Sequence, residues 1–163
     1  MKLFEDIVLT DSVEIAVPPE KVFDFLLGIV DDASYRAWHP DDHVAFRWIG
    51  GTPWEEGSVA HAEEYLHGRL HKLKFRVDKV VPKREIVYAP PSRILRIFFP
   101  ENRFEIRPSE RGCIFTARGH FRFGRIAKAL AKGKLEIGLT SVRKHMKEEG
   151  ENLKRILEME ATR

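Results

Sequence analysis

The chain has little cysteine, little net charge and no long apolar run, and each shortage excludes a class of protein. Its one cysteine, Cys113, provides neither an intramolecular disulfide nor a thiolate zinc site, because both need more than one. The 28 basic residues nearly balance the 25 acidic ones, and 43% of the 163 residues are hydrophobic, which is typical of a folded chain. No apolar run reaches the roughly 18 residues of a membrane span, so we expect none.

The start of the chain is interrupted by acids, at Glu5, Asp6, Asp11 and Glu14. It therefore does not resemble the apolar region of a secretory signal peptide, and we expect a soluble, cytoplasmic protein. The basic isoelectric point would suit nucleic-acid binding. Because acids are interspersed with bases almost everywhere, we expect no nucleic-acid partner.

The hydrophobic periodicity changes from strand-like to helical along the chain. Alternation predicts a strand at Ser12–Val17, and helical spacing after the Pro18-Pro19 pair predicts a helix at Glu20–Leu27 and a second at Asp31–Trp38. Six more strands are predicted at Ser58–His67, Leu70–Val81, Arg84–Tyr88, Arg93–Phe99, Arg103–Arg107 and Cys113–Phe123. From Gly124 to about Met159 the period of 3.6 predicts one long helix.

This order of elements, together with the segment Val13–Phe23, resembles the START/SRPBCC superfamily, the helix-grip fold of the birch-pollen allergens. The resemblance implies one α+β domain over residues 1–163. In it a curved antiparallel sheet of six to seven strands wraps the long C-terminal helix. The fold further implies a cavity for a small apolar or aromatic ligand. The oligomeric state stays open, with a homodimer among the alternatives.

The long helix carries a carboxylate where an apolar residue is expected. Its apolar stripe consists of Leu135, Leu139, Val142, Met146, Leu153 and Ile156. Glu149 lies inside this stripe and His145 at its edge, and two residues four apart reach the same point on a helix. A buried carboxylate is costly unless it is paired or bound to a metal. The two residues therefore form either a chelating pair or a simple His–Glu hydrogen bond.

Two further clusters contain residues that bind metals. The segment Tyr35–His43 ends a helix with His39, Asp42 and His43, which suits metal binding or, alternatively, a solvated loop with one structural histidine. On the predicted strand Ser58–His67, Glu63 and Glu64 point to opposite faces. Glu64 shares its face with two small alanines, which leaves room for an inward carboxylate. Either glutamate could instead be an outward, ion-paired acid.

Taken together, the three clusters resemble one enzyme family. The pattern is Tyr35-x-x-Trp38-x-Pro40-x-x-His43, then Glu64-Tyr65 before Gly68, then His145-x-x-x-Glu149. It resembles the diacetylphloroglucinol hydrolase/phloretin hydrolase family, zinc enzymes on a START-like fold that cleave a carbon–carbon bond between an acyl group and a phenolic ring. The resemblance implies four ligands for Zn²⁺ or another divalent transition metal: His43, Glu64, His145 and Glu149. It also implies that Tyr35 contacts the substrate.

Cleavage of an aryl ketone requires a proton donor for the ring carbon, and we consider Tyr35, His39 and His61 as candidates. Aromatic residues that could line an apolar pocket are Phe23, Trp38, Trp48, Phe75, Phe98 and Phe121. The alternative function is non-enzymatic binding or transport of a small hydrophobic ligand. A third hypothesis is the binding of a nucleic acid or an acidic partner through Lys72, Lys74, Arg76 and Lys79. A solvated face of a sheet explains these residues more simply.

Overall fold

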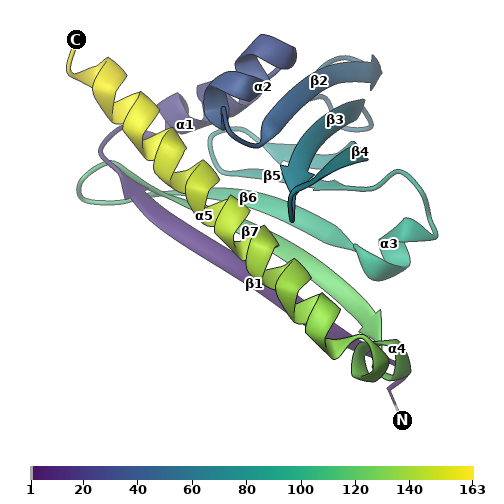
Figure 1. Cartoon of the computed structure of the whole chain (residues 1–163). Helices are drawn as coiled ribbons and strands as arrows, with labels where there is room; N and C mark the ends of the chain where they lie inside the picture. The colour runs from purple at the N-terminus through teal and green to yellow at the C-terminus, as the bar shows by residue number, and fades with distance from the viewer. Residues whose placement is uncertain (1) are drawn as a thin grey trace.

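The computed structural model describes residues 2–163 and shows a seven-stranded antiparallel sheet that curves around one long helix (Figure 1). The strand order is β1-β7-β6-β5-β4-β3-β2. The strands are β1 (Phe4–Ile15), β2 (His43–Gly50), β3 (Val59–Leu66), β4 (Arg69–Val81), β5 (Glu85–Ala89), β6 (Glu101–Pro108) and β7 (Cys113–Gly124). The helices are α1 (Pro19–Leu27), α2 (Asp32–Trp38), α3 (Leu95–Phe98), α4 (Arg125–Leu130) and α5 (Lys132–Ala161). The predicted α+β helix-grip architecture is confirmed.

The structure corrects several predicted element bounds. The first strand begins at Phe4 rather than Ser12, because β1 pairs with β7 over its whole length, from Phe4 opposite Gly124 to Ile15 opposite Cys113. Strand β2 lies in a segment for which no strand was predicted. The long helix is divided at Ala131 into α4 and α5.

The predicted strand at Arg93–Phe99 is wrong, since this segment forms the short helix α3. The chain turns at Ser92, whose hydroxyl accepts a hydrogen bond from the backbone N–H of Leu95 at 3.3 Å and whose carbonyl accepts one from Arg96 at 3.0 Å. The guanidinium of Arg96 then binds Asp78 on β4 with two hydrogen bonds, of 2.8 and 2.9 Å. These local contacts satisfy the backbone without a neighbouring strand.

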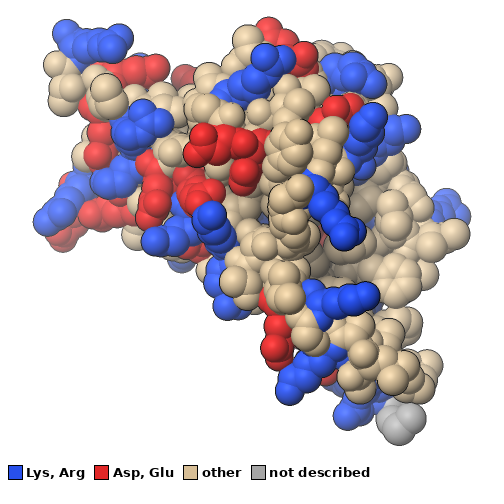
Figure 2. Space-filling view, viewed as in Figure 1, with Lys and Arg blue, Asp and Glu red and all other residues tan. Residues whose placement is uncertain are grey.

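Acidic and basic side chains are interspersed over the upper and left parts of the face shown in Figure 2. Three of the four basic residues of the third hypothesis, which lie on β4, have acids nearby. Lys72 is 3.9 Å from Glu63, Arg76 is 3.3 Å from Asp78, and Lys79 is 2.9 Å from Glu85. This pairing is typical of a solvated sheet face. The absence of a nucleic-acid partner stays a prediction.

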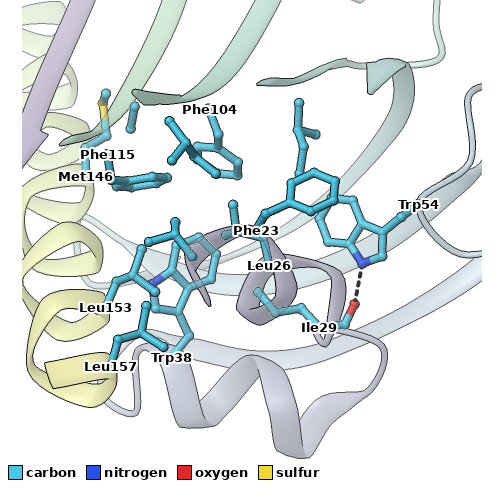
Figure 3. Packing of buried hydrophobic residues seen from close by; sticks show 14 of the residues in the cluster. Phe23, Leu26, Ile29, Trp38, Trp54, Phe104, Phe115, Met146, Leu153 and Leu157 are labelled. Carbon is cyan, nitrogen blue, oxygen red and sulfur yellow. Dashed lines mark hydrogen bonds between the residues drawn. The ribbon is translucent and has the colours of Figure 1, made fainter. Parts of the chain in front are cut away.

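The core lies between the concave face of the sheet and the helices (Figure 3). Met146 and Leu153 of α5 are buried there as the stripe predicts, but the stripe ends on Leu157, which is buried, rather than on Ile156. Facing them are aromatic rings of the sheet, including Phe104 and Phe115. Among the described residues 2–163, no helix is long and apolar enough to cross a membrane.

Gly112 lies just before β7, where a side chain has no space. A Cβ at this position would stand 2.4 Å from the carbonyl oxygen of Ile15 and 2.6 Å from the backbone nitrogen of Val17. We expect Gly112→Ala to lower the free energy of unfolding by roughly 1–3 kcal/mol, because the backbone at the end of β1 must move away. Urea unfolding followed by circular dichroism measures this change.

The matched control is Gly133→Ala in the first turn of α5, where nothing lies within 4 Å of the added carbon. Alanine favours a helix over glycine by up to about 1 kcal/mol, so this variant should be as stable as the wild type or more stable. Equal stability of the two variants would contradict the steric argument.

Candidate functional site

Four ionisable side chains converge beneath α5. His43 begins β2 and is the cross-strand partner of Glu64 on β3, while His145 and Glu149 descend from adjacent turns of α5. Nε2 of His43 lies 3.0 Å from Oε1 of Glu149 and 3.9 Å from Oε2 of Glu64. Nε2 of His145 lies 3.3 and 3.6 Å from the same two atoms. We call these residues the four-residue centre.

The strand alternation of β3 decides which glutamate reaches the centre. Glu64 points to the concave face together with Ala60 and Ala62, as their shared parity predicts. Glu63 and His61 point to the opposite face, where Nε2 of His61 lies 3.0 Å from Oε1 of Glu63. The open choice between the glutamates is therefore resolved for Glu64. The candidate proton donor His61 is not brought to the site, because it faces the other side of the sheet.

A glycine lets α5 approach the sheet beside this centre. Gly150 directly follows Glu149 and is buried against β1, where an added Cβ would stand 3.3 Å from Cγ1 of Val13. The indole N–H of Trp38 donates a hydrogen bond of 3.0 Å to the backbone carbonyl of Glu149. Both contacts fix the height at which the Glu149 carboxylate enters the core.

Each histidine is oriented by a hydrogen bond to its outer ring nitrogen. Nδ1 of His43 lies 2.9 Å from the backbone carbonyl of Tyr35, and because a carbonyl only accepts, Nδ1 carries the proton. Nδ1 of His145 lies 3.1 Å from the carboxylate of Asp42, which assigns its proton in the same way. In each imidazole, Nε2 is thereby directed at the two carboxylates. Histidine ligands of metals usually show this arrangement.

The side chains of this centre are largely buried, so their charges have to be balanced inside the protein. His43 and His145 are buried, and the side chains of Glu64 and Glu149 are each 12% exposed. Burial by itself raises the pKa of Glu149, but the adjacent His145 and His43 outweigh it and hold that pKa well below its usual range. Burial by itself lowers the pKa of His145, but Glu149, Glu64 and the bond to Asp42 raise it to about 10. Two buried carboxylates thus require compensating positive charge, from imidazolium or from a cation.

The spacing of the four donors also fits a divalent metal. Ligand atoms about 2.0–2.2 Å from a tetrahedral zinc ion lie roughly 3.3–3.6 Å from one another. The four nitrogen–oxygen separations of the centre, 3.0, 3.3, 3.6 and 3.9 Å, bracket this range. Two imidazoles and two carboxylates form a donor set that zinc accepts. These residues could therefore hold a metal after shifts of a few tenths of an ångström.

Tyr35 lies directly beside the centre. Its ring stacks on His43 with centroids 3.7 Å apart, and its hydroxyl donates a hydrogen bond of 2.6 Å to Oε2 of Glu64. Burial and the nearby Glu64 raise the pKa of Tyr35 well above its usual value. The phenol therefore keeps its proton and acts as a donor at the edge of the site.

His39 lies behind the centre rather than in it. Its Nδ1 accepts a hydrogen bond from the backbone N–H of Asp42 at 3.3 Å, and its Nε2 lies 3.0 Å from the carboxylate of Glu148. Both ring nitrogens are engaged, so the structure does not present His39 to a substrate as the candidate role requires. Sequence reasoning missed Glu148, whose only signal was its position next to the predicted ligand Glu149. It placed Asp42 in a cluster suited to metal binding but did not predict its contacts with His39 and His145.

An aromatic wall extends from the centre across the concave face. Its rings lie 5.0–6.0 Å apart between centroids, in the order Tyr35, Phe46, Phe75, Tyr88 and Phe104. Of the predicted pocket residues, Phe75 belongs to this wall, Trp48 packs against Phe46 and Phe75, Trp38 contacts Phe104, and Phe23 is part of the core. Phe98 lies on α3 and Phe121 packs against Phe99, away from the wall.

Comparison with known proteins identifies the family. Residues 6–158 match the family described as polyketide cyclase/dehydrase and lipid transport. The chain belongs to this family. The match confirms the predicted superfamily and its ligand-binding fold. Comparison with curated proteins found no match.

Solved structures show the same fold at low sequence identity. The Zhui aromatase/cyclase from Streptomyces sp. R1128 has a TM-score of 0.70 and 14% identity, with 95% of this chain and 94% of that one covered. The KanY protein has a TM-score of 0.70 and 15% identity, with coverages of 94% and 99%. Ara h 8.0201 has a TM-score of 0.63 and 11% identity, with coverages of 94% and 98%. These likenesses concern the fold alone.

We expect the protein to lose stability in alkali, because the phenols of Tyr35 and Tyr88 are buried. Burial and the nearby carboxylates raise the pKa of both groups in the folded protein. Their contribution is therefore fully present below the unfolded pKa of about 10 and is lost as pH rises above it. We expect Tyr88→Phe to reduce the alkaline slope of the free energy of unfolding by up to about 1.4 kcal/mol per pH unit.

Urea unfolding of wild type and variant between pH 9 and 11.5 measures this difference, with absorbance at 295 nm as a second readout. If all three tyrosines of the folded chain ionise together near pH 10, the expectation fails.

Proposed function

We propose that the chain is a zinc-dependent hydrolase that cleaves the carbon–carbon bond between an acyl group and a phenolic ring in a small ketone substrate. The proposal rests on one observation. The Nε2 atoms of His43 and His145 converge on the same two buried carboxylates, and both imidazoles are locked by their outer nitrogens. Another divalent transition metal would use the same donors.

The reaction adds water across the bond: a hydroxyl joins the acyl carbon, and a proton joins the ring carbon that leaves. A bound zinc ion would polarise the carbonyl and lower the pKa of a water molecule. His43, Glu64, His145 and Glu149 would hold the ion. The hydroxyl of Tyr35, held against Glu64 with its pKa raised, keeps a proton ready for the phenol or the ring carbon.

The aromatic wall accounts for the class of substrate. Phe46, Phe75 and Tyr88 present ring faces and edges next to the centre, which favours stacking of a phenolic ring over binding of an extended polar chain. The same rings exclude water, so that charges at the centre interact more strongly with a carbonyl than they would in solution.

Metal analysis of protein prepared without a polyhistidine tag tests the donor set. We expect about one zinc ion per wild-type chain and near-complete loss of it in His145→Ala and Glu149→Gln, because three donors hold zinc far more weakly than four. His61→Ala is the matched control, since it removes a histidine of the opposite sheet face and should keep its zinc. Absence of metal from the wild type, or the same metal content in all variants, would contradict the proposal.

Turnover tests the reaction separately from the metal. An acyl-phenol should be hydrolysed by the zinc-loaded wild type and by His61→Ala, and not by Glu149→Gln. Tyr35→Phe should retain zinc but lose about 10²–10⁴-fold in kcat, the usual contribution of a positioned proton donor. Retention of full activity by Tyr35→Phe would remove that residue from the chemistry.

Asp42 provides a test of how the site is positioned. Its carboxylate accepts the Nδ1 proton of His145, so Asp42→Asn should weaken zinc binding by about 10–100-fold while leaving all four ligands in place. Competition with a chromogenic chelator measures the dissociation constant. Asp41→Asn, one residue earlier and exposed, is the control and should bind zinc as the wild type does. An unchanged constant in Asp42→Asn would show that this hydrogen bond does not tune the site.

A second candidate function is the binding or transport of a small hydrophobic ligand without catalysis. The aromatic wall favours it, because it would contact an apolar ligand whether or not metal is present. Ligand binding that persists unchanged in Glu149→Gln, in protein that contains no metal, would favour this candidate over the hydrolase.

A further inference from the structure

One end of the molecule carries apolar side chains that the described chain leaves uncovered. Relative exposures are 71% for Leu3 before β1, 71% for Ile94 before α3, and 79% and 85% for Ile126 and Leu130 on α4. We call these four residues the apolar tip. Isolated exposed apolar residues are common on soluble proteins, but several gathered at one end mark an interaction surface.

Two contacts hold the segments of this tip together. The backbone N–H of Arg125 donates a hydrogen bond of 3.1 Å to the carbonyl of Leu3, which joins the start of β1 to α4. The rings of Phe4 and Phe98 meet edge to face with centroids 6.4 Å apart, which joins β1 to α3. On α4, Ile126 and Leu130 are four residues apart and share one face. The tip is therefore one surface built from three segments.

Basic side chains without acidic partners surround the apolar tip. Residues 121–135 include five basic residues and no acid, and of the five only Arg122 and Lys128 pair with acids, Asp6 and Glu5 of β1. Among residues 2–163, no carboxylate lies within 4.0 Å of the basic groups of Arg93, Arg125, Lys132 or Lys134, which we call the basic collar. In Figure 2 the end that carries α4 shows mainly basic and uncharged surface.

Further along α5, several basic residues have acidic partners. In its second half, Lys147 lies 3.2 Å from Glu151, and Lys154 lies near Glu158. Basic residues without a carboxylate within 4.0 Å also occur elsewhere in the described chain, for example Lys74 and Arg143, but at this end they coincide with protruding apolar side chains and with a segment, residues 121–135, that contains no acid. A partner that binds this end therefore has to complement both its positive charge and its exposed apolar side chains.

We propose that this end of the molecule docks on the surface of an anionic lipid bilayer. Protruding isoleucine and leucine side chains can enter the boundary between headgroups and acyl chains, while lysine and arginine above them meet lipid phosphates. A nucleic acid would satisfy the basic collar but gain nothing from the aliphatic tip. The bilayer satisfies both, so charge complementarity and apolar burial point to the same partner.

The docked orientation keeps the four-residue centre away from the bilayer. Leu130 precedes α5, and His145 lies 15 residues further along, which corresponds to about 22 Å at 1.5 Å per residue. The proposal therefore does not depend on the zinc hydrolase, and variants of the tip and collar leave the centre intact.

Vesicle flotation with the full chain tests the proposal. The probes are vesicles of phosphatidylcholine, alone or with about 30% phosphatidylglycerol, at low and at high salt. We expect wild type to float with the anionic vesicles only, and less at high salt. Lys132→Glu/Lys134→Glu and Ile126→Ser/Leu130→Ser should each lower the partition coefficient by about tenfold or more.

The matched control is Arg155→Glu/Met159→Ser, which alters an exposed basic and an exposed apolar residue four apart near the other end of α5. It should bind like the wild type, and circular dichroism should show that all variants are folded. Failure of wild type to float with anionic vesicles at low salt overturns the proposal, as does an equal loss in the control. A wild-type dimer that Ile126→Ser/Leu130→Ser converts to a monomer would also overturn it, by assigning the tip to a second copy of the chain.

Discussion

Two carboxylates, those of Glu64 and Glu149, are buried beneath α5, which restricts how the surrounding elements can pack. Each carboxylate is compensated by the imidazoles of His43 on β2 and His145 on α5. The cost of a buried charge without a partner is several kcal/mol. The centre therefore ties β2, β3 and α5 to a single relative position, because any displacement would separate charges from their partners.

The short helix α2 holds several side chains of the centre in position. Its start is held by a capping box, in which Asp31 and Ser34 satisfy each other's backbone groups. From it come Tyr35, whose carbonyl and hydroxyl bind His43 and Glu64, and Trp38, which binds the backbone of Glu149. One short helix thus orients three of the four groups of the centre. This concentration of hydrogen bonds is what a preorganised site needs, since ligands that are already oriented do not have to be ordered on binding.

The two ends of α5 lie in different chemical surroundings. The half that bears Glu149 closes a buried polar centre against an aromatic wall, and the other end carries aliphatic side chains and unpaired cations. The two regions share a helix but no residues. Binding of a hydrophobic ligand at the centre and docking of the tip on a lipid surface would be complementary functions. Different residues support each of the two proposals.

Local patterns and a family resemblance in the sequence predicted the fold class and most residues of the centre. The order of elements predicted the helix-grip architecture, and the position of Glu149 within an apolar stripe singled it out, because helical periodicity shows that a carboxylate will be buried. His145 followed from its spacing of four residues. Local pattern failed at Arg93–Phe99, where a mainly apolar segment folds as α3 through the turn at Ser92 and the contact between Arg96 and Asp78.

The packing of the elements against one another, which no local pattern shows, brings particular residues together. Periodicity along β3 shows that Glu63 and Glu64 face opposite ways, but which side is concave depends on how the sheet curves around α5. That curvature directed Glu64 to the centre and His61 away from it. The same is true of His39, which the chain places near His43 but whose two nitrogens are occupied by Asp42 and Glu148. Spacing along a chain defines the neighbours on one element, whereas a site between elements is defined by packing.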